Sequence, residues 1–162
     1  MKKLFVLIGV GATGLLAISS TCSNSASAHL PATTSKSEKI VEPKVQTDGI
    51  KFSKMTLEEA KKEAAKQNKL IFIDAYTEWC GPCKIMAKTS FKDADVAKLF
   101  NDNFINLQIE MEKDEDRKEV AMKYTVKAYP TLLIIDSKGN LVKQTLGLQS
   151  AERLLSFGKS VL

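Results

Sequence analysis

Residues 79–84 read Trp-Cys-Gly-Pro-Cys-Lys, and residues 70–75 shortly before them read Leu-Ile-Phe-Ile-Asp-Ala. The earlier stretch is short, nearly continuous in apolar residues and rich in β-branched and aromatic side chains, which is typical of a strand buried on both faces. A helical stretch follows and continues to about Thr89. We therefore predict that the two cysteines lie where a buried strand leads into a helix.

Cys80 and Cys83 are spaced so that they can meet across one helical turn and form a reversible disulfide without large backbone movement. Cys80 is expected at the helix N-terminus, where unpaired N–H groups and the helix dipole lower a cysteine pKa from about 8.5 to roughly 3.5–7.5. We predict that Cys80 is the nucleophile. Cys83, one turn further and less exposed, is predicted to resolve the mixed disulfide.

Two other interpretations of the cysteine pair are a zinc site and a purely structural disulfide. A zinc site is disfavoured because Cys22 and His29 are the other soft ligands, and both lie in the N-terminal segment. A structural disulfide that closes so short a loop gains little stability. We predict no metal and no cofactor.

The N-terminus has the features of a secretory signal: two lysines, an apolar run at residues 4–18, and small polar residues. The apolar run is shorter than the roughly 20 residues that a membrane-spanning helix needs. Two cleavage positions remain open. Ala26-Ser27-Ala28 is a small-x-small site, whereas Cys22 stands where a bacterial lipoprotein carries its lipidated cysteine.

We accordingly predict a signal peptide at residues 1–28, or at 1–21 with a lipidated Cys22. A flexible spacer at 29–48 and a folded domain at 49–162 follow. The formal charge of +5 falls to +3 when Lys2 and Lys3 are removed with the signal, since 22 basic residues then face 19 acidic ones. The charges are interspersed, so we expect no nucleic-acid binding, and we expect a monomer.

Hydrophobic periodicity and turn signals divide the domain into helices and strands. The predicted helices cover 56–68, with Thr56 and Glu59 as a capping box, 80–89, 93–100, 114–124 and a last helix capped by Ser150; the predicted strands cover 70–75, 104–109, 131–135 and 141–146. The expected order is strand, helix, strand, helix, strand, helix, strand, strand, helix, in which the first strand precedes residue 56 and the helices at 80–89 and 93–100 count as one. An α/β fold with a central mixed sheet and helices on both faces accommodates this order. The acidic run at 110–119 is interpreted as a solvated helix face.

The run at 79–84 is similar to the active site of thioredoxins, and the resemblance extends from about Met55 to the C-terminus. It implies a thioredoxin fold and thiol:disulfide exchange. Asp74 stands where the family has a buried carboxylate that moves protons for the resolving cysteine. Tyr129-Pro130-Thr131 resembles the family's cis-proline segment, which binds the substrate backbone, and Gly147 also fits the pattern. Trp79, Gly81 and Pro82 are predicted to contact the substrate together with Tyr129 and Pro130, and simple packing is the alternative for Trp79.

Two departures from ordinary thioredoxins indicate a particular subgroup of the family. Lys88 stands where they have a helix-kinking proline, and residues 106–110 contain no lysine near the buried carboxylate. The residues after Cys83 instead resemble exported thioredoxin-like proteins related to the C-terminal domain of the DsbD transmembrane reductase; they are Lys84, Lys88, Phe91, Asp93 and Val96. This resemblance implies a reductant of protein disulfides in the bacterial cell envelope, periplasmic or lipid-anchored, with a membrane electron donor of DsbD type. An oxidase or isomerase, and a redox-inert peptide-binding module, remain the alternatives.

Overall fold

The computed structural model describes residues 48–162, and the structural statements below concern this part of the chain. The signal peptide, its two cleavage positions, Cys22 and nearly all of the predicted spacer lie outside the described residues. Among the described helices, none has the length and apolar character needed to cross a membrane.

Helices and strands alternate along most of the described chain. They are α1 (Leu57–Gln67), β1 (Leu70–Tyr76), α2 (Gly81–Lys88), the 3-10 helix η1 (Ser90–Lys92), α3 (Ala94–Asn103), β2 (Phe104–Glu110), α4 (Arg117–Lys123), β3 (Thr131–Ile135), β4 (Leu141–Leu146) and α5 (Ala151–Lys159). The predicted capping box is present, since Thr56 and Glu59 exchange side-chain-to-backbone bonds at the start of α1. Ser150 caps α5, also as predicted.

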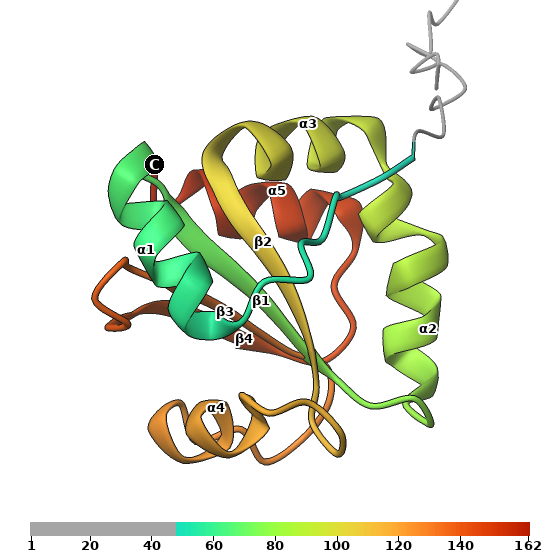
Figure 1. The fold of residues 1–162 in the computed structure, drawn as a ribbon. Coiled ribbons are helices and arrows are strands. Elements are labelled where there is room, and N and C mark those ends of the chain that lie inside the picture. Colours follow the sequence, from blue (N-terminus) through green and yellow to red (C-terminus); the bar gives the residue numbers. More distant parts are fainter. Residues whose placement is uncertain (1–47) are drawn as a thin grey trace, which may run out of the picture. The chain divides into compact units, whose positions relative to one another are not determined.

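The four strands form one mixed sheet in the order β2-β1-β3-β4. Strand β1 runs parallel to β2 and antiparallel to β3, and β4 continues the sheet antiparallel to β3. Helices α1 and α4 pack on one face, and α2, α3 and α5 pack on the other (Figure 1). The predicted mixed sheet with helices on both faces is confirmed.

Side chains of β1 alternate between the two cores, as the pleat of a strand requires. Ile71, Ile73 and Ala75 pack with α1 and α4, whereas Phe72 packs with α2, α3 and α5. Asp74 lies two residues after Phe72 and therefore faces the same side as Phe72. The alternation thus directs a carboxylate toward α2, the helix that carries Cys83.

Two details of the predicted elements were wrong. The first is a strand before α1: none precedes it within the described residues, and the chain there makes only an isolated parallel bridge between Ser53 and Leu107. The strand predicted at 104–109 is present as β2, and despite its alternating polarity it is buried along nearly all of its length. Asn106, for example, is 5% exposed and donates to the carbonyl of Phe100, which gives a buried polar side chain a partner.

The second error concerns the helix predicted at 114–124, which begins only at Arg117. Asp114 accepts a hydrogen bond from the backbone N–H of Glu110, and its carbonyl accepts one from the N–H of Arg117. The segment between β2 and α4 is therefore a turn that caps the end of the strand. The acidic run is also not one solvated helix face, because Glu110 belongs to β2 and is buried.

Candidate active site

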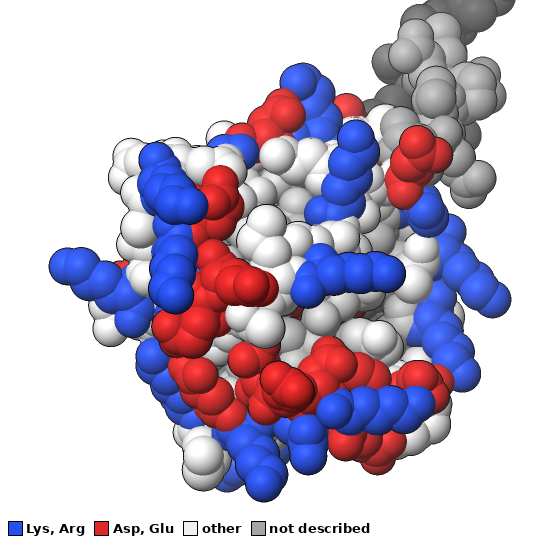
Figure 2. All heavy atoms as spheres, viewed as in Figure 1, with Lys and Arg blue, Asp and Glu red and all other residues white. Residues whose placement is uncertain are grey.

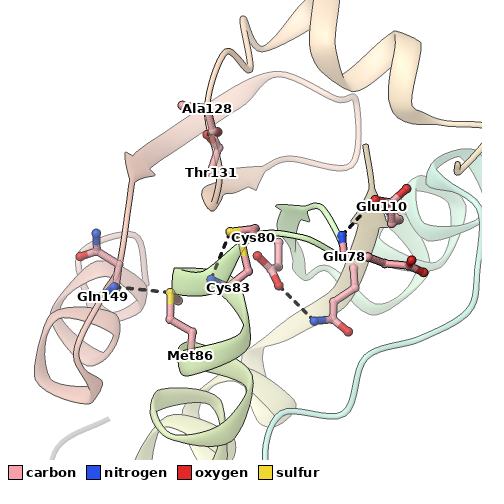
Figure 3. Close-up of a disulfide and its surroundings, with 10 residues drawn as sticks. Glu78, Cys80, Cys83, Met86, Glu110, Ala128, Thr131 and Gln149 are labelled. Carbon is pink, nitrogen blue, oxygen red and sulfur yellow. Dashed lines mark hydrogen bonds between the residues drawn. A yellow bond between two sulfur atoms is a disulfide. The ribbon is translucent and has the colours of Figure 1, made fainter. Parts of the chain in front are cut away.

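The two cysteines lie at the start of α2 and form a disulfide with a Cα–Cα distance of 5.3 Å. Cys80 is the N-cap residue, and its sulfur accepts the backbone N–H of Cys83 at 3.2 Å (Figure 3). The N–H of Cys80 donates to the carbonyl of Thr77 at 3.1 Å, which closes the turn between β1 and α2. Pro82 suits the first turn of a helix, where its missing N–H has no intrahelical role. The sulfur of Cys80 thus caps the N-terminus of α2 by accepting the N–H of Cys83.

The expected difference in exposure between the cysteines is absent. Cys80 is 4% exposed and Cys83 is 6% exposed, since the disulfide holds both sulfurs at a similar depth. Gly81 and Pro82 between them are exposed. Exposure in the oxidised form therefore does not distinguish the attacking sulfur from the resolving one, whereas the N-cap position of Cys80 does.

Asp74 is a buried carboxylate on the α2 side of β1, with 2% of its surface exposed. One of its oxygens, Oδ2, accepts a hydrogen bond from Gln108 Nε2 at 3.0 Å. Among the described residues its other oxygen, Oδ1, has no partner. Burial raises the pKa of Asp74 from its usual 3.8 to about 6, and the Gln108 bond opposes this rise only in part. The group can therefore exchange a proton close to neutral pH.

Gln108 was not among the residues predicted for the site. It lies in β2 directly opposite Asp74 in the parallel register. The absence of a lysine from this strand was noted in the sequence, but the residue that faces Asp74 instead depends on the pairing of β1 with β2. The register places an uncharged amide donor against the carboxylate.

Trp79 stands beside the disulfide and is 65% exposed, so it is not a core residue. Its ring meets Tyr129 edge-to-face at a centroid distance of 5.9 Å, and its Nε1 donates to Glu112 Oε1 at 2.9 Å. Tyr129 precedes Pro130 through a cis peptide bond, as the resemblance implied. The carbonyl of Pro130 accepts the N–H of Gly147 at 2.8 Å, and Gly147 has a φ of +83° that favours glycine.

Charged side chains border this region on both sides. Lys84 and Lys88 are exposed on α2, and basic side chains line the edge of the molecule over this helix (Figure 2). Exposed acidic residues lie in the turn between β2 and α4, among them Glu112, Asp114 and Glu115. Figure 2 shows acidic side chains gathered over this turn. Within residues 48–162 no group of three or more His, Cys, Asp or Glu side chains is arranged to hold a metal ion.

This geometry can be compared with known proteins. Residues 53–137 match the family model described as thioredoxin-like. The chain belongs to the thioredoxin-like family. Among the relatives of this thioredoxin-like chain is the thiol:disulfide interchange protein DsbD of Colwellia psychrerythraea, with 38% identity over 109 residues, covering 65% of this chain and 18% of that protein. Another is thioredoxin-T of Drosophila melanogaster, with 33% identity, covering 52% of this chain and 49% of that protein.

Solved structures show the same fold. The solution structure of a candidate disulphide isomerase from Bacteroides thetaiotaomicron is 45% identical, covers 73% of this chain and 99% of its own, and superposes with a TM-score of 0.63. A thioredoxin from Thermus thermophilus, at 20% identity, covers 70% of this chain and 87% of its own with a TM-score of 0.61. The predicted thioredoxin fold is confirmed, and so is the resemblance to thioredoxin-like and DsbD-related proteins. The chain spans less than half the length of the curated relatives named above.

The thioredoxin-like fold brings the predicted site residues into one region. The disulfide, Trp79 and the Pro130 segment meet at one end of the sheet, and Asp74 lies in the interior on the α2 side. Sequence reasoning missed Gln108 and Glu110, which are both in β2. Glu110 was taken for part of a solvated face, although it is 4% exposed. Its position directly after the predicted strand at 104–109 was the available signal.

Proposed function

We propose that this thioredoxin-like chain is an exported thiol:disulfide oxidoreductase that reduces protein disulfides in the bacterial cell envelope. The observation that carries the proposal is the Cys80–Cys83 disulfide at the N-terminus of α2, with the sulfur of Cys80 as the helix cap. Once the pair is reduced, the N–H of Cys83 and the dipole of α2 stabilise a thiolate on Cys80. The relatives named as thiol:disulfide interchange proteins support this chemistry.

The reaction begins with the reduced pair. The Cys80 thiolate attacks one sulfur of the partner's disulfide, a mixed disulfide forms, and the partner's other sulfur leaves as a thiolate. Cys83 then loses its proton and attacks the sulfur of Cys80, which releases the partner's second sulfur. The partner gains two electrons, and the chain ends with the Cys80–Cys83 disulfide that the structure contains. Asp74, deprotonated above pH 6, is proposed to accept the proton of Cys83.

The residues around the disulfide are proposed to receive the partner. Trp79 and Tyr129 form an aromatic surface on one side, and Gly81 and Pro82 are exposed between the cysteines. The cis peptide before Pro130 lies in the segment that runs into β3, next to the strand that leads to the cysteines. An extended segment of a disulfide-containing protein is proposed to bind across these residues.

The reducing direction and the location rest on separate arguments. Gly-Pro between the cysteines resembles thioredoxin, whose potential of about −270 mV makes it a better electron donor than the oxidant DsbA at about −120 mV. The envelope location is proposed from the predicted signal at residues 1–28, or 1–21 with a lipidated Cys22. Electrons are proposed to come from a membrane donor of DsbD type, since relatives carry that name.

Trapping of mixed disulfides tests the proposal. Cys83→Ser leaves a nucleophile without a resolving thiol, so Cys80-linked proteins should accumulate in the cell envelope. Cys80→Ser is the matched control and should trap almost nothing. Both variants are compared by non-reducing electrophoresis and mass spectrometry after acid quenching. If Cys80→Ser captures partners as well as Cys83→Ser does, the nucleophile is misassigned, and if neither captures any, the redox role fails.

A second candidate function is disulfide isomerisation, which the 45% identical structure from Bacteroides thetaiotaomicron favours by its description. An isomerase restores activity to ribonuclease with scrambled disulfides, whereas a reductase of low potential only opens those disulfides. The two functions are separated by this reactivation assay together with the measured reduction potential of the Cys80–Cys83 pair. A redox-inert binding module accelerates neither reactivation nor the reduction of insulin by dithiothreitol.

A further inference from the structure

Glu110 is a buried charged residue that the proposed reaction does not use. It is the last residue of β2, lies opposite Tyr76 at the end of β1, and is 4% exposed. A buried carboxylate costs free energy unless hydrogen bonds compensate for the lost water. The partners of Glu110 therefore indicate what the residue contributes.

Both carboxylate oxygens of Glu110 accept backbone N–H groups. Oε1 accepts the N–H of Glu78 at 3.3 Å, and Oε2 accepts the N–H of Glu112 at 2.9 Å. Figure 3 shows the bond from Glu78, beside the disulfide. Glu78 belongs to the turn between β1 and α2, and Glu112 to the turn between β2 and α4. One buried side chain thus joins the two turns by hydrogen bonds of the strong, charge-assisted kind.

Both turns converge on Trp79. Glu78 is its neighbour in the chain, and Glu112 accepts the hydrogen bond from its indole Nε1. The exposed ion pair between Glu78 and Lys113 connects the same turns but contributes little, since surface pairs are screened by water. With 65% of Trp79 exposed, core packing does not hold it, and its orientation depends on these bonds and on the edge of Tyr129.

We propose that Glu110 is a positioning residue of the active site. It holds Trp79 in the orientation that contacts a protein substrate during disulfide exchange. The assignment rests on the proposed thiol:disulfide exchange. Glu110 does not touch the sulfurs in this role. It acts through two backbone segments, and its effect should be large for protein substrates and small for small disulfides that need no aromatic surface.

The variant Glu110→Gln tests the assignment with nearly the same shape. A glutamine has one acceptor oxygen for two N–H groups, so one backbone N–H then faces an amide donor and loses its bond. Glu115→Gln is the charge-matched control, since it removes the same charge from an exposed position in the turn between β2 and α4. Trp79 is the only tryptophan of the sequence, so tryptophan fluorescence reports on this residue alone.

For Glu110→Gln we expect the kcat/KM for insulin to fall about five- to tenfold, as the loss of one buried hydrogen bond implies, with DTNB reduction changed less than about twofold. The fluorescence anisotropy of Trp79 should fall as well. Glu115→Gln should match the wild type in all three measurements. An equal fall with insulin and DTNB, or no fall with either, would overturn the proposal while the proposed function stands, provided that the wild type reduces both.

Amide hydrogen exchange of the wild type tests the same hydrogen bonds and does not depend on whether a variant folds. The N–H of Glu115 donates no hydrogen bond within the described part of the chain, whereas those of Glu78 and Glu112 donate to Glu110. Both bonded amides should exchange at least about tenfold more slowly than that of Glu115. Exchange of the Glu78 amide as fast as that of Glu115 would show that Glu110 does not hold this turn, and would overturn the assignment.

Discussion

Asp74 and Glu110 are two buried carboxylates on neighbouring strands, and they differ in how fully their oxygens are hydrogen-bonded. Asp74 receives one bond, from the side-chain amide of Gln108, and within residues 48–162 its second oxygen has no partner. Glu110 receives a backbone N–H on each oxygen. A buried carboxylate with too few donors gains from taking up a proton, whereas a carboxylate with a donor on each oxygen holds those donors in place. The first is suited to proton transfer and the second to holding backbone.

The largest effect expected from this difference is on stability, and it has opposite signs at the two sites. Because burial raises the pKa of Asp74 to about 6, the protonated carboxyl favours the folded state fully below about pH 4, and this contribution is lost as the pH rises through 6. Asp74→Asn stays neutral, so it should be more stable than the wild type by about 2–3 kcal/mol at pH 8. Urea unfolding of the oxidised proteins at pH 4 and pH 8 measures this gain.

The comparison variant for that measurement is Glu110→Gln. It should lose stability relative to the wild type at pH 8, because it leaves a buried N–H without an acceptor. A gain in Asp74→Asn that is the same at pH 4 and pH 8 would show that its origin is packing and not titration. If both variants are more stable than the wild type at pH 8, the two carboxylates do not differ in the proposed way.

A smaller effect is expected on the kinetics of resolution. Asp74→Asn should slow the attack of Cys83 on the mixed disulfide by about tenfold at pH 7, because no carboxylate accepts the proton of Cys83. Initial attack by Cys80 should stay nearly unchanged, since its thiolate depends on the helix N-terminus. Stopped-flow kinetics with a model disulfide separates the two steps. If both steps are slowed equally, or neither is slowed, Asp74 does not act specifically as the proton acceptor of Cys83.

The smallest effect should come from a substitution of Gln108, because it removes the hydrogen-bond partner of Asp74 and leaves the Asp74 carboxylate in place. Gln108→Leu removes the bond that lowers the pKa of Asp74, so this pKa should rise above its present value of about 6. The midpoint of the pH dependence of resolution should move upward by less than about one unit. Carboxyl NMR chemical shifts of Asp74 report the same titration directly. A midpoint that moves downward, or stays in place, would show that Gln108 does not tune this carboxylate.

Much of the site could be predicted from the sequence because its signals are local. The spacing of Cys80 and Cys83, the preceding apolar run and the following helix placed the disulfide at the N-terminus of α2, where the structure has it. The capping residues Thr56 and Ser150 also act on backbone groups a few positions away. Interactions of this range depend on residue type and spacing, so they are encoded without knowledge of the fold.

The remainder required the tertiary structure, because it depends on which strands pair. Polar residues alternate with apolar ones along β2, yet the neighbouring strand and the helices on both sides bury nearly the whole strand. The same pairing sets Gln108 against Asp74 and brings Glu110 to the turn that carries Trp79. Asp74 and Gln108 are 34 residues apart in the chain. A contact between residues so far apart leaves no periodic trace in one sequence, since it arises only when the buried apolar surface of the whole domain selects one register.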